Sequence, residues 1–335
     1  MRWIPTASEI LANEPACVRV VVARIKGSTP REAGANMLIG KTTVMGTIGG
    51  GMLEFQAIEK ARTMLAMAAP APSFVNIPLG PNLGQCCGGQ VTLCYQPLTA
   101  ANLAALTAAD PEKQHFVTRD SMSPDHYRML ASGDLGSLGI SQLAADRLGA
   151  GTTPEMLKTD DGMILVEPPQ PRRPQLCLFG AGHVGRELVH VLGRHDVDIH
   201  WIDQRKGEFP LSFPSNTRPL ALPDPMAFVA LAPAGADWLV MTHDHALDLQ
   251  LCDAILRRGD FRFFGLIGSE TKHTRFRKRL AEAGHDASTI ARITCPIGLP
   301  EIQSKRPEVI AVSVAAELLC LPEIEKMPRQ FTGTK

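Results

Sequence analysis

The sequence has no excess of charge of either sign, because its 34 Lys and Arg residues are balanced by 34 Asp and Glu residues. Proteins that bind nucleic acids non-specifically need a basic surface that neutralises phosphates, so we expect no nucleic-acid partner. The sequence also lacks an apolar run of the roughly 18–20 residues that cross a bilayer, and we expect no membrane association. The first residues, with Glu9 and Glu14 among them, lack the apolar core of a secretory signal. A cytoplasmic protein is therefore expected.

The closely spaced cysteines of a disulfide-rich domain are also missing. The eight cysteines are scattered, and several fall in apolar strand or helix patterns, which predicts reduced and mostly buried thiols. Cys86 and Cys87 differ, because they are adjacent and stand in the glycine-rich stretch 79–89. Backbone N–H groups of such a loop stabilise a thiolate, which binds soft metals or carries sulfur. We interpret this pair as a site of metal, sulfur or redox chemistry, with a purely structural role as the alternative.

The chain is long enough for two domains. Residues 167–174 contain four prolines, which favour extended backbone and interrupt helices and central strands. We therefore predict an N-terminal domain over 1–168, a proline-rich linker over 169–174 and a C-terminal domain over 175–325.

The C-terminal domain alternates short apolar strands with helices, a pattern typical of a parallel sheet covered on both faces. The expected strands are 176–179, 198–202, 238–241 and 263–267, and the clearest helices are 184–192, 246–257 and 309–319. This pattern predicts a Rossmann-like α/β domain.

The N-terminal domain also reads as α/β. We expect helices at 8–13 and 54–67, and strands at 17–25, 73–77, 90–96, 115–118, 127–130 and 163–167. Residues 100–108 suit either a helix or a linker, and the glycine-rich interval 133–151 is expected to be loop.

A glycine-rich turn follows the first strand of the C-terminal domain and opens its first helix. In this Gly-x-Gly-x-x-Gly pattern, Gly180 permits a tight turn, Gly182 admits a pyrophosphate and Gly185 allows close packing of strand and helix. Asp203 ends the next strand, where a carboxylate accepts hydrogen bonds from ribose hydroxyls. The pattern predicts a dinucleotide-type turn, although dehydrogenases more often have a small or neutral residue at the position of His183. A packing turn without a ligand is the alternative.

Polar residues also follow the strand 238–241, at the edge where open α/β sheets bind ligands. His243, Asp244, His245 and Asp248 supply two imidazoles and two carboxylates, which are suited to holding a divalent metal or relaying a proton. The alternative is that Thr242 or Asp244 caps the helix that follows.

The strand 263–267 is followed by a basic helix. Ser269 is suited to capping it, and Lys272, Arg275 and Arg279 share one face. A basic face is usually only solvated. Because the first turn lies beside the ligand edge, we nevertheless treat Lys272 and Arg275 as phosphate-binding candidates, together with Ser269.

Three successive glycines, Gly49, Gly50 and Gly51, precede a helix in the N-terminal domain. Such a run forfeits backbone entropy, which favours a specific use as a backbone cradle for an anionic or pterin-like ligand. A crowded turn is the alternative. Glu54 then either complements the helix dipole or contacts the ligand.

Eight short motifs follow one another along almost the whole chain, including Gly-Gln-Cys-Cys-Gly-Gly at 84–89 and Thr-His-Asp-His-x-Leu-Asp at 242–248. The others lie at 27–31, 46–54, 180–185, 201–205, 265–272 and 295–298. In this order they resemble the XdhC/CoxI family, the accessory proteins that mature molybdenum hydroxylases.

The resemblance implies a carrier and chaperone rather than an enzyme with turnover of its own. It implies binding of molybdenum cofactor (molybdopterin), protection of the cofactor while a cysteine desulfurase supplies sulfur, and delivery to apo-xanthine dehydrogenase. Cys86 or Cys87 would then lie near the molybdenum or relay sulfur. A homodimer is expected from the resemblance and from the frequency of twofold oligomers.

The sequence leaves the ligand sites and the function open. Either domain is suited to hold the pterin, and the Rossmann domain is suited to hold a nucleotide. One alternative function is that of an NAD(P)-dependent oxidoreductase. The other is that of an accessory factor for a molybdenum hydroxylase that uses a cytosine-dinucleotide cofactor.

Overall fold

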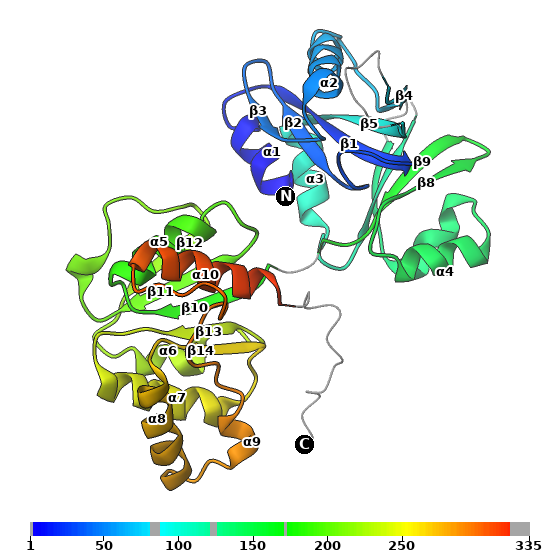
Figure 1. Cartoon of the computed structure of the whole chain (residues 1–335). Coiled ribbons are helices and arrows are strands. Elements are labelled where there is room, and N and C mark those ends of the chain that lie inside the picture. The colour runs from blue at the N-terminus through cyan, green and yellow to red at the C-terminus, as the bar shows by residue number, and fades with distance from the viewer. Residues whose placement is uncertain (1–2, 81–87, 121–125, 171–172, 322–335) are drawn as a thin grey trace. The chain divides into compact units, whose positions relative to one another are not determined.

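A computed structural model describes residues 3–80, 88–120, 126–170 and 173–321 of the protein. The chain divides into two compact units, Met1–Pro171 and Arg172–Lys335, and the division falls inside the proline-rich segment. Both units are α/β, and the parallel sheet predicted for the C-terminal part is present (Figure 1).

The first unit contains a five-stranded antiparallel sheet, here called sheet A, with the strand order β3-β2-β1-β5-β4. Its strands are β1 (Ala16–Lys26), β2 (Asn36–Ile39), β3 (Val44–Gly46), β4 (Ser73–Pro78) and β5 (Gln90–Thr99). Alternate side chains of β1 point to opposite faces of the sheet. Val18, Val20 and Val22 pack under helix α2 (Gly51–Leu65), whereas Cys17 packs with helices on the other face.

Helices α1 (Trp3–Leu11) and α3 (Ala100–Ala108) lie on that other face. The predicted helix 8–13 was placed too late, because the buried stripe of α1 begins with Trp3 and continues through Ala7 and Ile10. Pro5 lies in the first turn, where a missing N–H costs nothing. Of the two readings left open for 100–108, the helix is correct, and Thr99 caps it.

The first unit also has a four-stranded antiparallel sheet, here called sheet B, in the order β7-β6-β9-β8. Its strands are β6 (His115–Arg119), β7 (Tyr127–Leu130), β8 (Glu155–Thr159) and β9 (Gly162–Glu167). The expectation of loop over 133–151 is wrong. This interval holds the 3-10 helix η3 (Ser132–Leu138) and helix α4 (Gln142–Ala150), which bury Leu135, Leu138 and Leu148 with residues of sheet B.

A buried ion pair joins the two sheets of the first unit. Arg19 of β1 donates from Nη1 and Nη2 to the two carboxylate oxygens of Glu167 in β9, over 2.9 and 2.8 Å. Gln96 of β5 accepts from Arg19 Nη1 and donates to Glu167. Removal of either charge would leave the other buried and unpaired, so the pair fixes how the sheets meet.

The second unit is built on a five-stranded parallel sheet, here called sheet C, in the order β12-β11-β10-β13-β14. Its strands are β10 (Gln175–Phe179), β11 (Asp198–Asp203), β12 (Thr217–Ala221), β13 (Asp237–Val240) and β14 (Phe263–Leu266). The order reverses between β10 and β13, which creates the crevice where sheets of this kind bind ligands.

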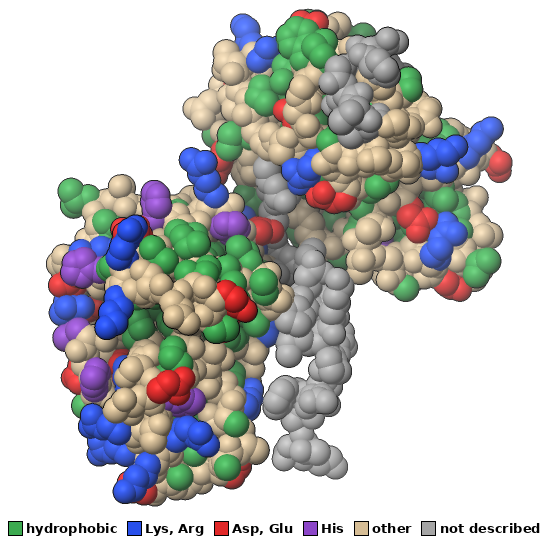
Figure 2. All heavy atoms as spheres, in the orientation of Figure 1, with side chains coloured by type: hydrophobic (Ala, Val, Ile, Leu, Met, Phe, Trp, Pro, Cys, Tyr) green, Lys and Arg blue, Asp and Glu red, His purple; other side chains and the backbone are tan. Residues whose placement is uncertain are grey.

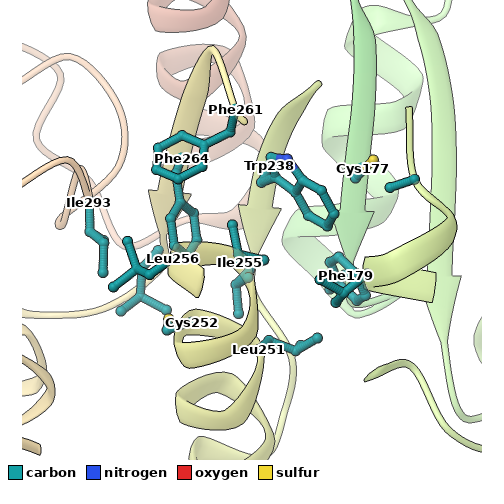
Figure 3. Close-up of a cluster of buried hydrophobic side chains, with 14 of the residues drawn as sticks. Cys177, Phe179, Trp238, Leu251, Cys252, Ile255, Leu256, Phe261, Phe264 and Ile293 are labelled. Atoms are coloured by element: carbon teal, nitrogen blue, oxygen red, sulfur yellow. The ribbon is translucent and has the colours of Figure 1, made fainter. Parts of the chain in front are cut away.

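Helices cover both faces of sheet C. Leu176 and Leu178 pack with α5 (His183–Leu192) and α10 (Pro307–Leu319). Cys177 and Phe179 point to the opposite face and pack with α6 (Met226–Leu231) and α7 (His245–Arg258), as Figure 3 shows for α7. Helices α8 (Glu270–Glu282) and α9 (Ala287–Ile290) complete this layer, and a short 3-10 helix, η4 (Lys206–Glu208), follows β11.

Candidate functional site

Three motif-bearing loops of the first unit emerge at the same end of sheet A. The segment 27–35 joins the end of β1 to β2, and the triple glycine follows β3. The segment 79–89 joins the end of β4 to the start of β5, and its base is closed by a hydrogen bond from Leu79 N–H to the Gly89 carbonyl oxygen over 2.8 Å. Because neighbouring strands of sheet A are antiparallel, all three loops lie at the same end of its strands.

These loops touch at glycines. A Cβ atom at Gly89 would lie 2.1 Å from the carbonyl oxygen of Ser28, and one at Gly49 would lie 2.5 Å from Cγ of Pro30. Gly27 also lies near Gly89, since a Cβ there would lie 3.2 Å from the Gly89 Cα atom. A contact this close admits only glycine at position 89. Because the contacts join the segment 27–35 to Gly49 and to Gly89, the fold brings the three motifs together.

The N–H groups of the triple-glycine turn are occupied by Glu54. One carboxylate oxygen of Glu54 accepts from the N–H groups of Ile48, Gly49 and Gly50, over 2.9, 3.1 and 2.7 Å, and from the hydroxyl of Thr47. Burial alone would raise the pKa of Glu54, but these hydrogen bonds lower it below its ordinary value. The anion in this cradle is the protein's own carboxylate, and Gly51 begins helix α2 behind it.

The two adjacent cysteines, Cys86 and Cys87, lie outside the described residues. Among the described cysteines, burial raises the pKa of Cys17 and Cys177 to about 12 and that of Cys295 to about 11. Cys94 and Cys252 are also buried, and Cys320 is exposed. The buried thiols stay protonated and are therefore unsuited to thiolate chemistry.

In the second unit, the glycine-rich turn has the predicted geometry. Gly180 has φ of 119° and approaches the turn after β13, because a Cβ there would lie 2.3 Å from the Met241 carbonyl oxygen. A Cβ at Gly185 would lie 2.2 Å from the Gly180 carbonyl oxygen. A Cβ at Gly182 meets no described atom within 4 Å, so the turn leaves room for a ligand to approach its backbone. His183 is exposed at the first position of α5.

Asp203 is buried, and its carboxylate oxygens have partners within the protein. One oxygen accepts from the N–H group of Ala181 over 2.7 Å, and both accept from the Arg205 guanidinium over 3.0 Å. Burial alone would raise the pKa of Asp203, but Arg205 and the Ala181 N–H group lower it. A ribose hydroxyl would therefore compete with Arg205 for this carboxylate.

The His-Asp-His segment lies at the start of α7, and Asp244 is the residue that caps the helix. Its carboxylate accepts from the N–H groups of Ala246 and Leu247. His243 and His245 are exposed on either side. Within the described part of the chain no three His, Cys, Asp or Glu side chains are placed to hold a metal ion.

Asp248 and Lys272 form an ion pair that was not predicted. The Lys272 ammonium donates to Asp248 over 2.5 Å and to the Ile267 carbonyl oxygen over 2.8 Å. The other carboxylate oxygen of Asp248 accepts from the hydroxyl of Thr242 over 2.6 Å. The pair involves residues 24 apart in the sequence, and no local pattern announces it.

Several of the predicted residues line one cavity of about 230 Å³ between the first turns of α7 and α8. They are His245, Ser269, Lys272, Arg275 and Arg279. Ser269 caps α8 by accepting from the Lys272 N–H group. Figure 2 shows basic side chains gathered over α8. The structure thus brings the predicted phosphate ligands together, with Lys272 already committed to Asp248.

Comparison with known proteins adds family information. A family model for the XdhC Rossmann domain matches residues 176–318, and one for the XdhC and CoxI family matches residues 10–76. The chain belongs to the XdhC and CoxI family.

Two similar proteins extend the comparison. A crystal structure of a protein from Bacillus halodurans, described as a xanthine dehydrogenase, superposes with a TM-score of 0.70 at 21% identity and covers 96% of each chain. At this identity the likeness shows the fold. The uncharacterized protein YqeB of Escherichia coli (strain K12) is 26% identical over 295 residues, which are 88% of this chain and 41% of that protein. This XdhC-family chain therefore spans less than half the length of that relative.

No helix in the described ranges is long and apolar enough to cross a membrane.

Proposed function

We propose that this XdhC-family protein is an accessory factor that binds molybdenum cofactor and delivers it to an apo-molybdenum hydroxylase of the xanthine dehydrogenase type. The observation that carries the proposal is the convergence of three family motifs at one end of sheet A. A Cβ atom at Gly49 or Gly89 would collide with the loop 27–35 or its start, and Gly27 lies close to Gly89. Such packing is expected where separate loops build one binding surface.

The groups at this end of the sheet fit the cofactor in two respects. Gly50, Gly80 and Gly88 would direct a Cβ into space free of described atoms, so a ligand can approach the backbone there. In the sequence, Cys86 and Cys87 belong to the same motif as Gly89 and precede it by three and two residues. The bound cofactor would supply a dithiolene-held molybdenum, a metal centre that suits a soft thiolate ligand.

The cysteine pair gives the proposal its chemical role. A thiolate in a glycine-rich loop either ligates the molybdenum or passes on sulfur that a cysteine desulfurase has supplied. The protein then acts as a carrier between three partners: the desulfurase, the cofactor and xanthine dehydrogenase. A homodimer is the assembly that we expect to perform this transfer.

The Rossmann unit has its own proposed ligand. The open space beside Gly182 favours a pyrophosphate-bearing nucleotide, and the cavity at Arg275 offers a cation near the same edge. The Asp203–Arg205 pair argues against ribose recognition of the kind used by NAD-dependent dehydrogenases. The two units would thus serve different parts of one delivery cycle.

The test is activation of apo-xanthine dehydrogenase in a defined mixture of this protein, molybdenum cofactor, cysteine desulfurase and a sulfur donor. We expect xanthine oxidation to rise several-fold when the protein is present. When Cys86 and Cys87 are both replaced by serine, we expect the activity to be no higher than in a mixture that lacks the protein. Equal activation by the C86S/C87S variant would refute the thiol role. A parallel assay with an apo-hydroxylase that uses a cytosine-dinucleotide cofactor separates the two target classes. Lack of activation of either enzyme would refute the accessory function.

A further inference from the structure

The first unit has a cavity of about 360 Å³ between sheet A and the β8–β9 hairpin. Its floor comes from β1, β4 and β5, and Met156 and Met163 of the hairpin form a wall. This volume is in the range of small-molecule sites, which span about 300–1,000 Å³. Of the residues singled out from the sequence, none that the structure describes lines it.

The strand register explains why this end of the sheet is hollow and polar. Deeper in the sheet, Val21, Cys94 and Phe74 align across three strands, and the first two are buried against sheet B. The register shifts between Val22 and Arg24. Beyond this bulge the face that packs on sheet B carries Arg24, Thr92 and Asn76 where it carried Val21, Cys94 and Phe74 before.

Two polar rows form the floor beyond the bulge. In the first row Arg24, Thr92 and Asn76 are register partners across β1, β5 and β4. In the second, Lys26 pairs with Gln90. The floor therefore presents a guanidinium, an ammonium, two amides and a hydroxyl, a set rich in hydrogen-bond donors.

The charges on this floor are uncompensated by the protein residues that the structure describes. None of the described residues that line the cavity is acidic, and the exposed side chains of Arg24 and Lys26 have no hydrogen-bond or ion-pair partner among the described residues. Other arginines nearby are paired: Arg147 with Glu155 over 2.8 Å, and Arg19 with Glu167. Two unpaired cations in a concave site attract an anion, and an arginine fork suits phosphate oxygens.

The walls favour a flat, polarisable group next to that anion. Phe74 lines the cavity together with the thioethers of Met156 and Met163. Aromatic and thioether groups pack well on the face of a heterocycle. The Gln90 and Asn76 amides are placed to hydrogen-bond with its edge.

We infer that this cavity binds a phosphate monoester carried on a planar heterocycle, with Arg24 and Lys26 holding the phosphate. The inference rests on the proposed function in one respect, since the pterin phosphate of molybdenum cofactor belongs to this chemical class. The site lies at the edge where the motif loops meet, because a Cβ at Gly89 would lie 2.8 Å from the Lys26 carbonyl oxygen. The cavity assigns the phosphate-bearing end of the cofactor to the first unit.

Two fluorescent probes test this without molybdenum: 6-hydroxymethylpterin phosphate and its parent alcohol, titrated into the full chain. We expect the phosphate ester to bind about tenfold more tightly than the alcohol, and R24Q/K26Q to lose this preference. The matched control is K41Q/R62Q, which removes two exposed cations that do not line the cavity. Thermal unfolding establishes that both variants fold. Equal affinity of R24Q/K26Q and the wild type for the ester would overturn the inference.

Loading with molybdenum cofactor separates this inference from the proposed function. If the wild type carries the cofactor and R24Q/K26Q carries as much, the cavity assignment fails and the carrier function stands. If the ester binds through Arg24 and Lys26 but the wild type carries no cofactor, the carrier function fails and the cavity assignment stands.

Discussion

Asp248 on α7 and Lys272 on α8 form an ion pair at the carboxyl edge of sheet C, with the Asp248 side chain fully buried and that of Lys272 10% exposed. The pair also binds Thr242 and the Ile267 carbonyl oxygen, which follow β13 and β14. Two loops and two helices of the Rossmann unit therefore depend on one pair of charges.

Replacement of Lys272 by methionine should lower the free energy of unfolding of the second unit by about 3 kcal/mol, because Asp248 is left buried without its cation. This corresponds to a fall in Tm of roughly 6–12 °C. R275Q is the matched control, since Arg275 is exposed on the same helix, and it should change the unfolding free energy by less than about 0.5 kcal/mol. Equal effects of K272M and R275Q would show that the ion pair does not stabilise the unit.

Two neighbouring glycines, Gly88 and Gly89, test whether the loops at this end of sheet A pack against one another. In G89A the new Cβ would collide with the Ser28 carbonyl oxygen, so we expect a loss of about 2 kcal/mol of stability and of most cofactor loading. In G88A the Cβ meets no described atom within 4 Å, so stability should be retained. Thermal unfolding and pterin content of both variants check this. A G89A protein with wild-type stability would contradict the convergence of the loops.

A second glycine pair tests the Rossmann turn. G185A should destabilise the second unit by about 2 kcal/mol, because its Cβ would lie 2.2 Å from the Gly180 carbonyl oxygen. G182A should keep the stability but weaken nucleotide binding, because its Cβ occupies the space that a pyrophosphate would enter. Calorimetric titration with nucleotides and dinucleotides measures this. If a nucleotide binds equally well to G182A, the turn is not its site.

Glu54 predicts a specific pH dependence. Its pKa is lowered from the ordinary value of 4.5, so its contribution to stability is fully present above that value and is lost as the pH falls through the folded-state pKa. E54Q should be about 1–2 kcal/mol less stable than the wild type at pH 7, a figure that allows for partial exposure to solvent. The difference should shrink below about pH 4.5. Urea unfolding at several pH values measures it, with the exposed Glu59→Gln on the same helix as control. A difference that does not vary with pH would rule out the ionised Glu54 as its source.

The elements that were predicted correctly are those whose own residues carry the signal. The apolar run of β10 and the glycines after it indicate a buried parallel strand and a tight turn. The strands missed carry weaker signals. Strand β12 is an edge strand that contains Pro219, and β2 and β3 are short. Helix α4 was not predicted, because it has few buried residues and glycines lie close to them in the sequence.

For the candidate site residues, too, only what the local sequence determines could be predicted. Their chemical types pointed to anions and cations, but the partners are set by contacts distant in the sequence. Asp203 reaches back 22 residues to Ala181, and Lys272 reaches 24 residues to Asp248. The cavity at Arg24 and Lys26 depends on strand register and on a bulge, which composition does not encode.

The most direct test of the account is pterin and molybdenum analysis of the full chain, purified without oxygen from a molybdenum-replete cell that makes the cofactor. We predict bound pterin and molybdenum in near-equal amounts, approaching one of each per chain, with much less of both in the C86S/C87S variant. A wild-type preparation without pterin or molybdenum, which also fails to take up added cofactor, would contradict it.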